Sequence, residues 1–334
     1  KRGSNDPALT SKIDTVFAAQ KDGTYRPRAL LFDLESAATS QVRSGKIGKL
    51  FSEDNAHCGA SKGPLNWANS HYTDGPYAID QSVNVVRREI EALDGFQGFN
   101  WMLDLAEGVG SGFGTLLISK LREEYPDRMS NVNAFLPSVT AQKSNEIYNL
   151  ILSIHQLIEN SDWTAFYERD TMTKLAGNAQ QVNGYFASCV SDVTAPLRFR
   201  STVLSDMRKY GTIQVLFPRL HFFTVCRSVN QNSIRQHLDA CYNENNSLSR
   251  NPLNEGNEIS SVIILRGGNF AQKEFEAEMV GLKARNTEQG QMIPWIPNNL
   301  MGAKLKVAGS GTNSSCTAIH NSTSIGYTLR TFLE

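Results

Sequence analysis

Apolar residues follow two patterns in the first half of the chain. In some segments they continue almost without interruption, as they do in strands that are buried on both faces of a sheet. In others they recur every three or four positions, as they do on one face of a helix. The runs predict strands at 28–35, 96–105 and 132–136, and the recurrences predict helices that contain Ile79 to Leu93, Phe113 to Tyr125 and Ile147 to Ile158. Strands that alternate with helices are typical of a parallel sheet covered on both faces.

The second half of the chain continues the alternation after one long helix. Apolar positions from Val182 to Leu197 keep helical spacing and predict that helix. Strands are predicted at 213–217, 262–265 and 305–308, and a further helix at 270–285. An α/β fold is therefore expected, with ligand-binding residues at the C-terminal ends of the parallel strands.

Composition and charge narrow the class of protein. Lysine plus arginine and aspartate plus glutamate each number 33, so the formal net charge is zero. Nucleic acid and anionic membranes are therefore not the expected partners. No apolar run reaches the roughly 18 residues that a membrane-spanning helix needs. The five cysteines are scattered and odd in number, which favours free thiols in a reducing cytoplasm.

The segment from Asp104 to Tyr125, DLAEGVGSGFGTLLISKLREEY, carries the most specific chemistry of the sequence. Gly108, Gly110, Ser111 and Gly112 fall between a predicted strand and a predicted helix. Glycines at such a turn let backbone N–H groups approach a phosphate, and the helix N-terminus adds partial positive charge. A tight strand-to-helix turn that binds no ligand is the alternative interpretation.

Sequence blocks on both sides of this segment resemble tubulin. The run GTLLISKLREEYPDR is similar to tubulin, and so are VRSGKIGKLF, NWANSHYTDG, LSIHQLIEN, FPRLHFF, WIPNN and NSTSI. The blocks keep the order that they have in tubulins, and they cover nearly the whole chain. The sequence therefore resembles a divergent, β-like tubulin.

The resemblance implies two domains. Residues 1–168 correspond to a nucleotide-binding GTPase domain with a Rossmann-like parallel sheet, and residues 169–334 correspond to the core helix and an α/β intermediate domain. The first strand and glycine loop of an intact tubulin have no counterpart ahead of Lys1, and the C-terminal helices have none after Glu334. Either the full protein has these parts, or its sheet closes differently.

The resemblance also implies a site for GTP or GDP with Mg²⁺. Asp33 and Glu35, at the end of the first predicted strand, are expected on the magnesium side, although a solvated strand end would also carry two acids. The residues expected to bind the nucleotide are Gly108, Gly110, Ser111, Gly112, Glu35, Ser138, Glu146 and Asn183. No residue is carried over as catalytic.

Several positions depart from the family pattern and predict weak nucleotide binding. Glu107 replaces a glycine and Val109 replaces a threonine, so a negative charge is added near the phosphates and a hydroxyl is lost. One repulsion at about 4 Å with an effective dielectric of about 20 costs at most about 4 kcal/mol. Leu65 stands where an asparagine is expected on the phosphate side, and Ala179 stands where a tyrosine would stack on the base. GTPase activity is therefore expected to be weak or absent.

The resemblance further implies head-to-tail assembly with α-tubulin or tubulin-like subunits. Lys209 stands where an α-type chain has a glutamate that acts on its neighbour's GTP, which is the β-type pattern. The lateral loop of tubulins is expected within Thr224–Asn232, where it is too short for ordinary side-by-side contacts. The leading hypothesis is a cytoskeletal subunit of microtubules or related filaments. The alternatives are a tubulin that still binds and turns over GTP, and a non-polymerising protein that sequesters α-tubulin.

Overall fold

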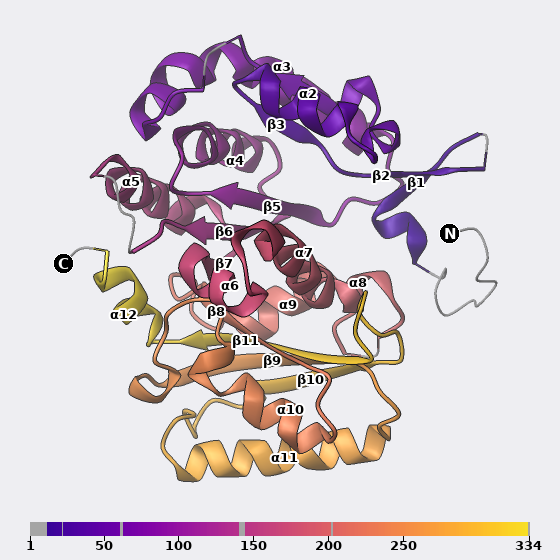
Figure 1. The fold of residues 1–334 in the computed structure, drawn as a ribbon, viewed down its shortest axis with the longest axis vertical. Coiled ribbons are helices and arrows are strands. Elements are labelled where there is room, and N and C mark those ends of the chain that lie inside the picture. The colour runs from indigo at the N-terminus through magenta and orange to yellow at the C-terminus, as the bar shows by residue number, and fades with distance from the viewer. Residues whose placement is uncertain (1–11, 22, 61–62, 140–143, 202, 333–334) are drawn as a thin grey trace. The chain divides into compact units, whose positions relative to one another are not determined.

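The computed structural model describes residues 12–21, 23–60, 63–139, 144–201 and 203–332 (Figure 1). The chain divides into two compact units. The smaller unit comprises Ile13–Val132 and Gln142–Ser161, and the larger unit comprises Lys1–Lys12, Asn133–Ala141 and Asp162–Glu334. The predicted division after residue 168 concerns functional domains and stays a prediction.

The smaller unit combines two short strand pairs, one longer strand and several helices. β1 pairs antiparallel with β2, and β3 pairs parallel with β4. The first half of β6 (Met129–Leu136) lies beside β5. The other elements are β1 (Phe17–Ala19), β2 (Tyr25–Pro27), β3 (Leu31–Asp33), α2 (Ser36–Ser44), β4 (Ala56–Cys58), α3 (Gly75–Glu91), β5 (Gly98–Asp104), α4 (Gly114–Glu124) and α5 (Ser144–Asn160).

Helices α3 and α4 supply most of the core of the smaller unit. Their buried side chains stand at the predicted helical spacing and include Ile79, Val83, Val86, Leu117 and Leu121. The predicted helices are therefore confirmed, and so is the strand predicted at 96–105. The strand predicted at 28–35 is wrong in extent and burial. Only Leu31–Asp33 forms β3, because three residues alone pair with β4, and they are half-buried.

The larger unit is built on a mixed sheet with the strand order β10-β9-β11-β8-β7, followed by the second half of β6. β7 runs parallel to β8 and β9 runs parallel to β10, whereas β11 is antiparallel to both β8 and β9. The strands are β7 (Trp163–Glu168), β8 (Phe222–Val229), β9 (Glu258–Gly267), β10 (Leu300–Leu305) and β11 (Ser314–Ser322). The helices are α6 (Arg169–Ala176), α7 (Val182–Val193), α8 (Ala195–Arg198), α9 (Met207–Gln214), α10 (Ile234–Cys241), α11 (Gln272–Glu288) and α12 (Ile325–Arg330).

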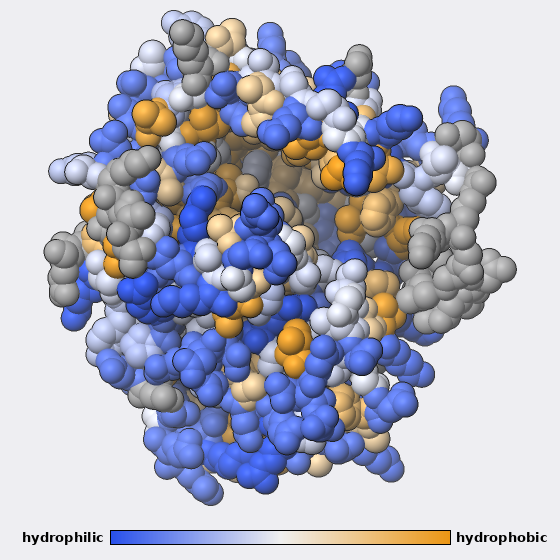
Figure 2. Space-filling view, viewed as in Figure 1, coloured by the Kyte–Doolittle hydropathy of each residue, from blue (hydrophilic) through white to orange (hydrophobic). Residues whose placement is uncertain are grey.

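Helices cover both faces of this sheet (Figure 1). Buried residues of α7 and α9 pack on one face, and those of α10 and α11 pack on the other. Every residue of β9 and β11 is buried as a result. The outer side of α10 and α11 is mostly hydrophilic (Figure 2). None of the helices that the structure describes is long and apolar enough to span a membrane.

Three predictions about the second half are wrong in detail. The strand predicted at 213–217 is not formed, because Met207–Gln214 is helical and the strand begins at Phe222. The strand predicted at 305–308 ends at Leu305. The predicted long helix is divided into α7 and α8, and Pro196, which has no backbone N–H to donate, stands in the first turn of α8.

The lateral loop predicted within Thr224–Asn232 is also wrong in extent. β8 continues to Val229, so residues 230–232 and the cap residue Ser233 alone connect this strand to α10. Asn230 turns the chain with a positive φ of 52°, and its side-chain oxygen accepts a 3.0 Å hydrogen bond from the N–H of Asn313. The connection is therefore a tight turn fixed by the neighbouring loop.

A buried ion pair links β9 and β11. His320 Nδ1 lies 2.6 Å from Glu258 Oε1, and both side chains are almost fully buried. Burial opposes the charged imidazole, but hydrogen bonding to Cys226 and Glu258, together with the Glu258 charge, raises the pKa of His320 well above its usual value. The hydroxyl of Tyr242 donates to the same carboxylate at 3.1 Å. The pair therefore lies buried in the sheet among polar partners, which include Ser261 and the carbonyl oxygen of Cys241.

Candidate functional site

The glycine segment of the smaller unit starts a helix. At the end of β5, Asp104 Oδ1 accepts a 3.0 Å hydrogen bond from the N–H of Ala106 and so shapes the turn. Gly108 then adopts helical φ and ψ of −63° and −38°, and the π-helical turn η5 (Val109–Phe113) leads directly into α4. The glycines are therefore part of the first helical turns. The first N–H groups of a helix lack intrahelical acceptors and can face an anion, whereas the N–H of Ser111 donates to the carbonyl oxygen of Glu107 at 3.1 Å.

These glycines also allow the backbone to pack closely. A Cβ added at Gly108 would lie 2.1 Å from the carbonyl oxygen of Pro64, and one added at Gly112 would lie 2.5 Å from that of Trp67. Neither distance is compatible with any side chain larger than hydrogen. The glycines are therefore required by the segment from Gly63 to His71, whether or not a phosphate binds.

Asn149 on α5 joins three parts of this region. Its Oδ1 accepts a 2.7 Å hydrogen bond from the N–H of Trp67, and its Nδ2 donates to the carbonyl oxygens of Leu65 at 3.0 Å and Ala106 at 2.9 Å. The side chain is buried. The sequence analysis did not single out Asn149. The only signal was an amide beside Leu150 on the apolar face of a predicted helix.

The segment before α3 is held by an aromatic pair. Trp67 and His71 stack with ring centroids 4.3 Å apart, and Trp67 Nε1 donates to Thr115 Oγ1 at 3.3 Å. His71 Nδ1 lies 3.1 Å from the carbonyl oxygen of Gly112. Burial lowers the pKa of His71, although the bond to this carbonyl opposes the shift. The neutral imidazole ring of His71 therefore packs between the turn that leads into α3 and the turn that leads into α4.

Three side chains of the glycine segment differ in their availability to a ligand. The Ser111 hydroxyl is buried and donates to the carbonyl oxygen of Glu107 at 2.6 Å. The Glu107 side chain is exposed. Val109, which offers no hydrogen bond, is half-buried. In this arrangement backbone N–H groups, rather than the serine hydroxyl, are the donors that can meet an anion.

The two predicted magnesium-side acids lie at the end of β3. Asp33 Oδ1 accepts a 3.0 Å hydrogen bond from the N–H of Glu35. A Cβ placed on Gly63 would lie 3.2 Å from Glu35 Oε2 and 4.0 Å from Val109, so Glu35 is close to the start of the glycine helix. No group of three or more His, Cys, Asp and Glu side chains that could hold a metal occurs among the described residues. Two carboxylates nevertheless suit Mg²⁺, which usually keeps water and phosphate oxygens as further ligands.

The remaining predicted residues are divided between the units. Glu146 is half-buried in the first turn of α5 in the smaller unit. In the larger unit, Ser138 donates to Asp170 Oδ1 at 2.7 Å, and Asn183 is exposed near the start of α7. Ala179, which stands where a stacking tyrosine is expected, is exposed as well.

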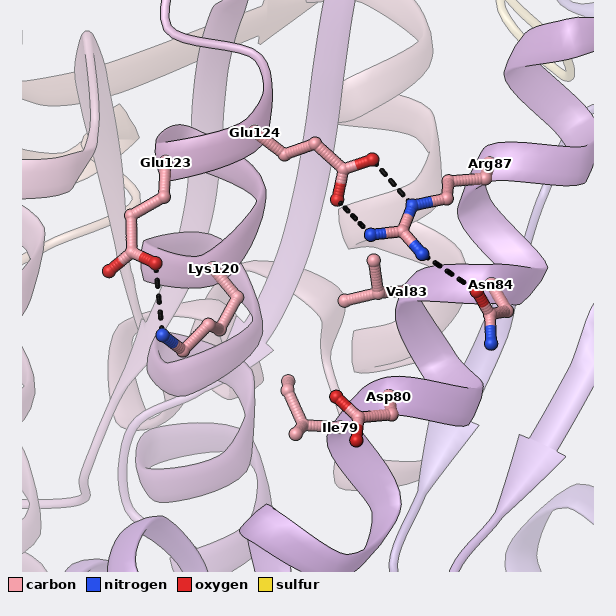
Figure 3. A pocket seen from close by; sticks show the side chains of 8 residues that line it. All are labelled: Ile79, Asp80, Val83, Asn84, Arg87, Lys120, Glu123 and Glu124. Atoms are coloured by element: carbon pink, nitrogen blue, oxygen red, sulfur yellow. Dashed lines mark hydrogen bonds and ion pairs between the residues drawn. The ribbon is translucent and has the colours of Figure 1, made fainter.

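A groove in the smaller unit lies between α3 and α4 and has a cavity volume of about 510 Å³ (Figure 3). Arg87 crosses it and donates from Nε and Nη2 to the two carboxylate oxygens of Glu124, at 2.6 and 2.8 Å. These bonds hold the pKa of Glu124 below its usual value. Lys120 pairs with Glu123 at 2.9 Å. The groove contains none of the predicted nucleotide residues.

Comparison with known proteins agrees with this architecture. Residues 4–177 match the GTPase domain of the Tubulin/FtsZ family, so the chain belongs to that family. It is 37% identical to the tubulin beta-1 chain of Colletotrichum gloeosporioides over 332 residues, which cover 95% of this chain and 73% of that protein. It is 35% identical to the tubulin beta chain of Candida albicans over 339 residues, which cover 96% and 75%. The chain is thus a divergent, β-tubulin-like member of the family.

Proposed function

We propose that this chain is a cytoskeletal subunit that binds α-tubulin or a tubulin-like partner head-to-tail and holds guanine nucleotide weakly. The observation that carries the first part is its similarity to β-tubulins over almost its whole length. Lys209 supports the β-type role, because a lysine stands here where an α-type chain has a glutamate. It lies in the first turn of α9, where its Nζ donates to Ser205 Oγ at 2.8 Å. A head-to-tail contact propagates into filaments without closing.

The proposed nucleotide site uses the start of the glycine helix. We assign the phosphates to the backbone at Gly108, Gly110, Ser111 and Gly112, where the glycine helix begins. Glu35 is assigned a place beside them. Bound Mg²⁺ would neutralise phosphate charge, and Asp33 and Glu35 are the residues assigned to it. Ser138, Glu146 and Asn183 are assigned to the rest of the nucleotide by family resemblance. GTP and GDP are the proposed ligands.

The side chains of the proposed site support weak nucleotide binding, because they provide few groups that can hydrogen-bond or stack on a nucleotide. Val109 supplies no hydroxyl, and the Ser111 hydroxyl is already bound to the backbone. Ala179 has no ring to stack on a base. Because the Glu107 side chain is exposed, its repulsion of a phosphate at about 4 Å is closer to about 1 kcal/mol than to about 4. The loss of several contacts, rather than one charge, is therefore the proposed cause.

Extraction of nucleotide from the purified protein tests the proposed weakness. A perchloric-acid extract, analysed by ion-exchange chromatography, should contain far less GTP and GDP than an equal amount of ordinary tubulin. Near-stoichiometric guanine nucleotide would contradict the proposal. It would favour the second candidate function, a tubulin with a retained nucleotide switch.

A microtubule subunit also needs side-by-side contacts with its neighbours, and the structure gives these lateral contacts the least support. The tight turn at residues 230–232 replaces a longer lateral loop, so we expect the isolated chain not to form closed tubes. A protein that pairs longitudinally without lateral contacts would cap or sequester its partner. Electron microscopy of the chain with and without tubulin distinguishes these outcomes, because closed tubes from the isolated chain would rule out sequestration.

A further inference from the structure

The larger unit contains a buried cluster of charges centred on Asp192. This carboxylate accepts from Arg227 Nε at 2.9 Å and from Arg266 Nη1 at 2.6 Å. The Asp192 residue is 1% exposed, and Arg227 and Arg266 are 5% and 3% exposed. Two guanidinium groups therefore share one carboxylate. Burial of a charge without a matching opposite charge is costly.

A third guanidinium increases the imbalance. Arg198 Nη2 donates to Ser191 Oγ at 2.8 Å and also to the Ser191 carbonyl, which in turn accepts from Arg266 Nη1 at 3.2 Å. Both guanidinium groups also approach the ring of Phe199, at 5.2 and 5.7 Å from its centroid. Arg198 has no ion-pair partner among the residues that the structure describes. Burial, and then repulsion by Arg266, lowers the pKa of Arg198.

Two buried hydroxyl groups lie beside the same carboxylate. Thr312 Oγ1 and Ser315 Oγ have no hydrogen-bond partner within the described part of the chain. A Cβ placed on Gly309 would lie 2.9 Å from Thr312 Oγ1, 3.5 Å from Ser315 Oγ and 3.3 Å from Asp192 Oδ1. Ser315 is fully buried. Hydroxyl groups without a partner can donate to an oxyanion. The Asp192 carboxylate beside them would repel such an anion, so the charge of the three arginines has to outweigh this repulsion.

We propose that this cluster binds a small oxyanion of the phosphate or sulfate class, separately from the nucleotide segment of the smaller unit. Arg198 provides the entrance, because it is partly exposed whereas Arg227 and Arg266 are buried. Its Nη1 group is the part that can meet the anion, because Nη2 donates to Ser191 and Nε donates to Thr194 Oγ1 at 3.3 Å. Arg266 supplies charge behind it, and the hydroxyls of Thr312 and Ser315 supply neutral donors. One bound anion offsets the excess charge that Asp192 leaves.

Calorimetric titration of the whole chain with inorganic phosphate, at constant ionic strength maintained with sodium chloride, tests this site. The variant Arg198→Gln removes the charge and keeps an amide that can bond Ser191, and Arg200→Gln makes the same charge change at an exposed position two residues away. The expected result is saturable binding that Arg198→Gln weakens at least tenfold, or about 1.4 kcal/mol. Arg200→Gln should change it by less than twofold.

A second variant keeps the test decisive if Arg198→Gln does not fold. Thr312→Val removes one hydroxyl from a loop and should weaken phosphate binding at least threefold, while circular dichroism shows an unchanged fold. Equal weakening by Arg198→Gln and Arg200→Gln would overturn the proposal, because it would reflect general surface charge. Absence of saturable binding in the unmodified chain would overturn it as well.

Discussion

Removal of the Asn149 side chain is expected to destabilise the smaller unit more than any other single amide deletion on α5. Asn149→Ala leaves the buried N–H of Trp67 and the carbonyls of Leu65 and Ala106 without their partner. A buried donor or acceptor left unsatisfied costs about 1–3 kcal/mol, and carbonyl groups tolerate the loss better than N–H groups. The expected loss is about 3–5 kcal/mol, a large part of the roughly 5–15 kcal/mol that stabilises a typical domain.

Urea unfolding followed by circular dichroism and tryptophan fluorescence measures this loss. Asn145→Ala is the matched control, because Asn145 is exposed on the first turn of the same helix and should change stability by less than about 0.5 kcal/mol. Asn149→Asp should also be destabilising, since a carboxylate would face two carbonyl oxygens. A stability for Asn149→Ala within 0.5 kcal/mol of the control would refute the idea that this amide joins the three segments.

Three other changes test separate parts of the structure. Gly112→Ala should cost about 1–3 kcal/mol in urea unfolding, because the added carbon would lie 2.5 Å from a backbone oxygen, whereas Gly184→Ala, with nothing within 4 Å, should not destabilise. Because the pKa of His320 is raised by folding, its stabilising effect should be complete below about pH 6.5 and decline as pH rises through the folded value. His320→Gln should flatten this pH dependence of unfolding, and the exposed His155→Gln should leave it unchanged. Glu107→Gly should raise GTP affinity by less than about tenfold, since the repulsion of an exposed carboxylate is about 1 kcal/mol; calorimetry that shows a much larger gain would mean that this charge is the main obstacle.

Periodic helices could be predicted from the sequence because their packing follows local spacing. The helix containing Ile147 to Ile158 is present as Ser144–Asn160, and its apolar positions needed no knowledge of distant partners. Strand limits were harder to predict. The run from Val215 to Phe217 is apolar, yet Leu216 and Phe217 are 36% and 40% exposed, and the strand begins later, at Phe222. Hydrophobicity alone does not distinguish an exposed apolar turn from a strand.

The candidate site could be predicted only in part for a related reason. The sequence identified the glycines, but their contacts with Pro64 and Trp67 depend on a segment that is distant along the chain. The bonds of Asn149 cross 43 to 84 positions, and no local pattern indicates them. The excess of positive charge around Asp192 likewise arises from strands and helices that meet only after folding.

Co-expression with α-tubulin tests the central claim most directly. Sedimentation velocity and native mass spectrometry of the purified material should show a one-to-one complex, as the proposed head-to-tail contact requires. An exposed Trp295 within the WIPNN block offers a variant, Trp295→Ala, that should weaken this complex if the block lies on that surface. Recovery of the chain alone, with no α-tubulin bound at micromolar concentrations, would contradict the proposed function.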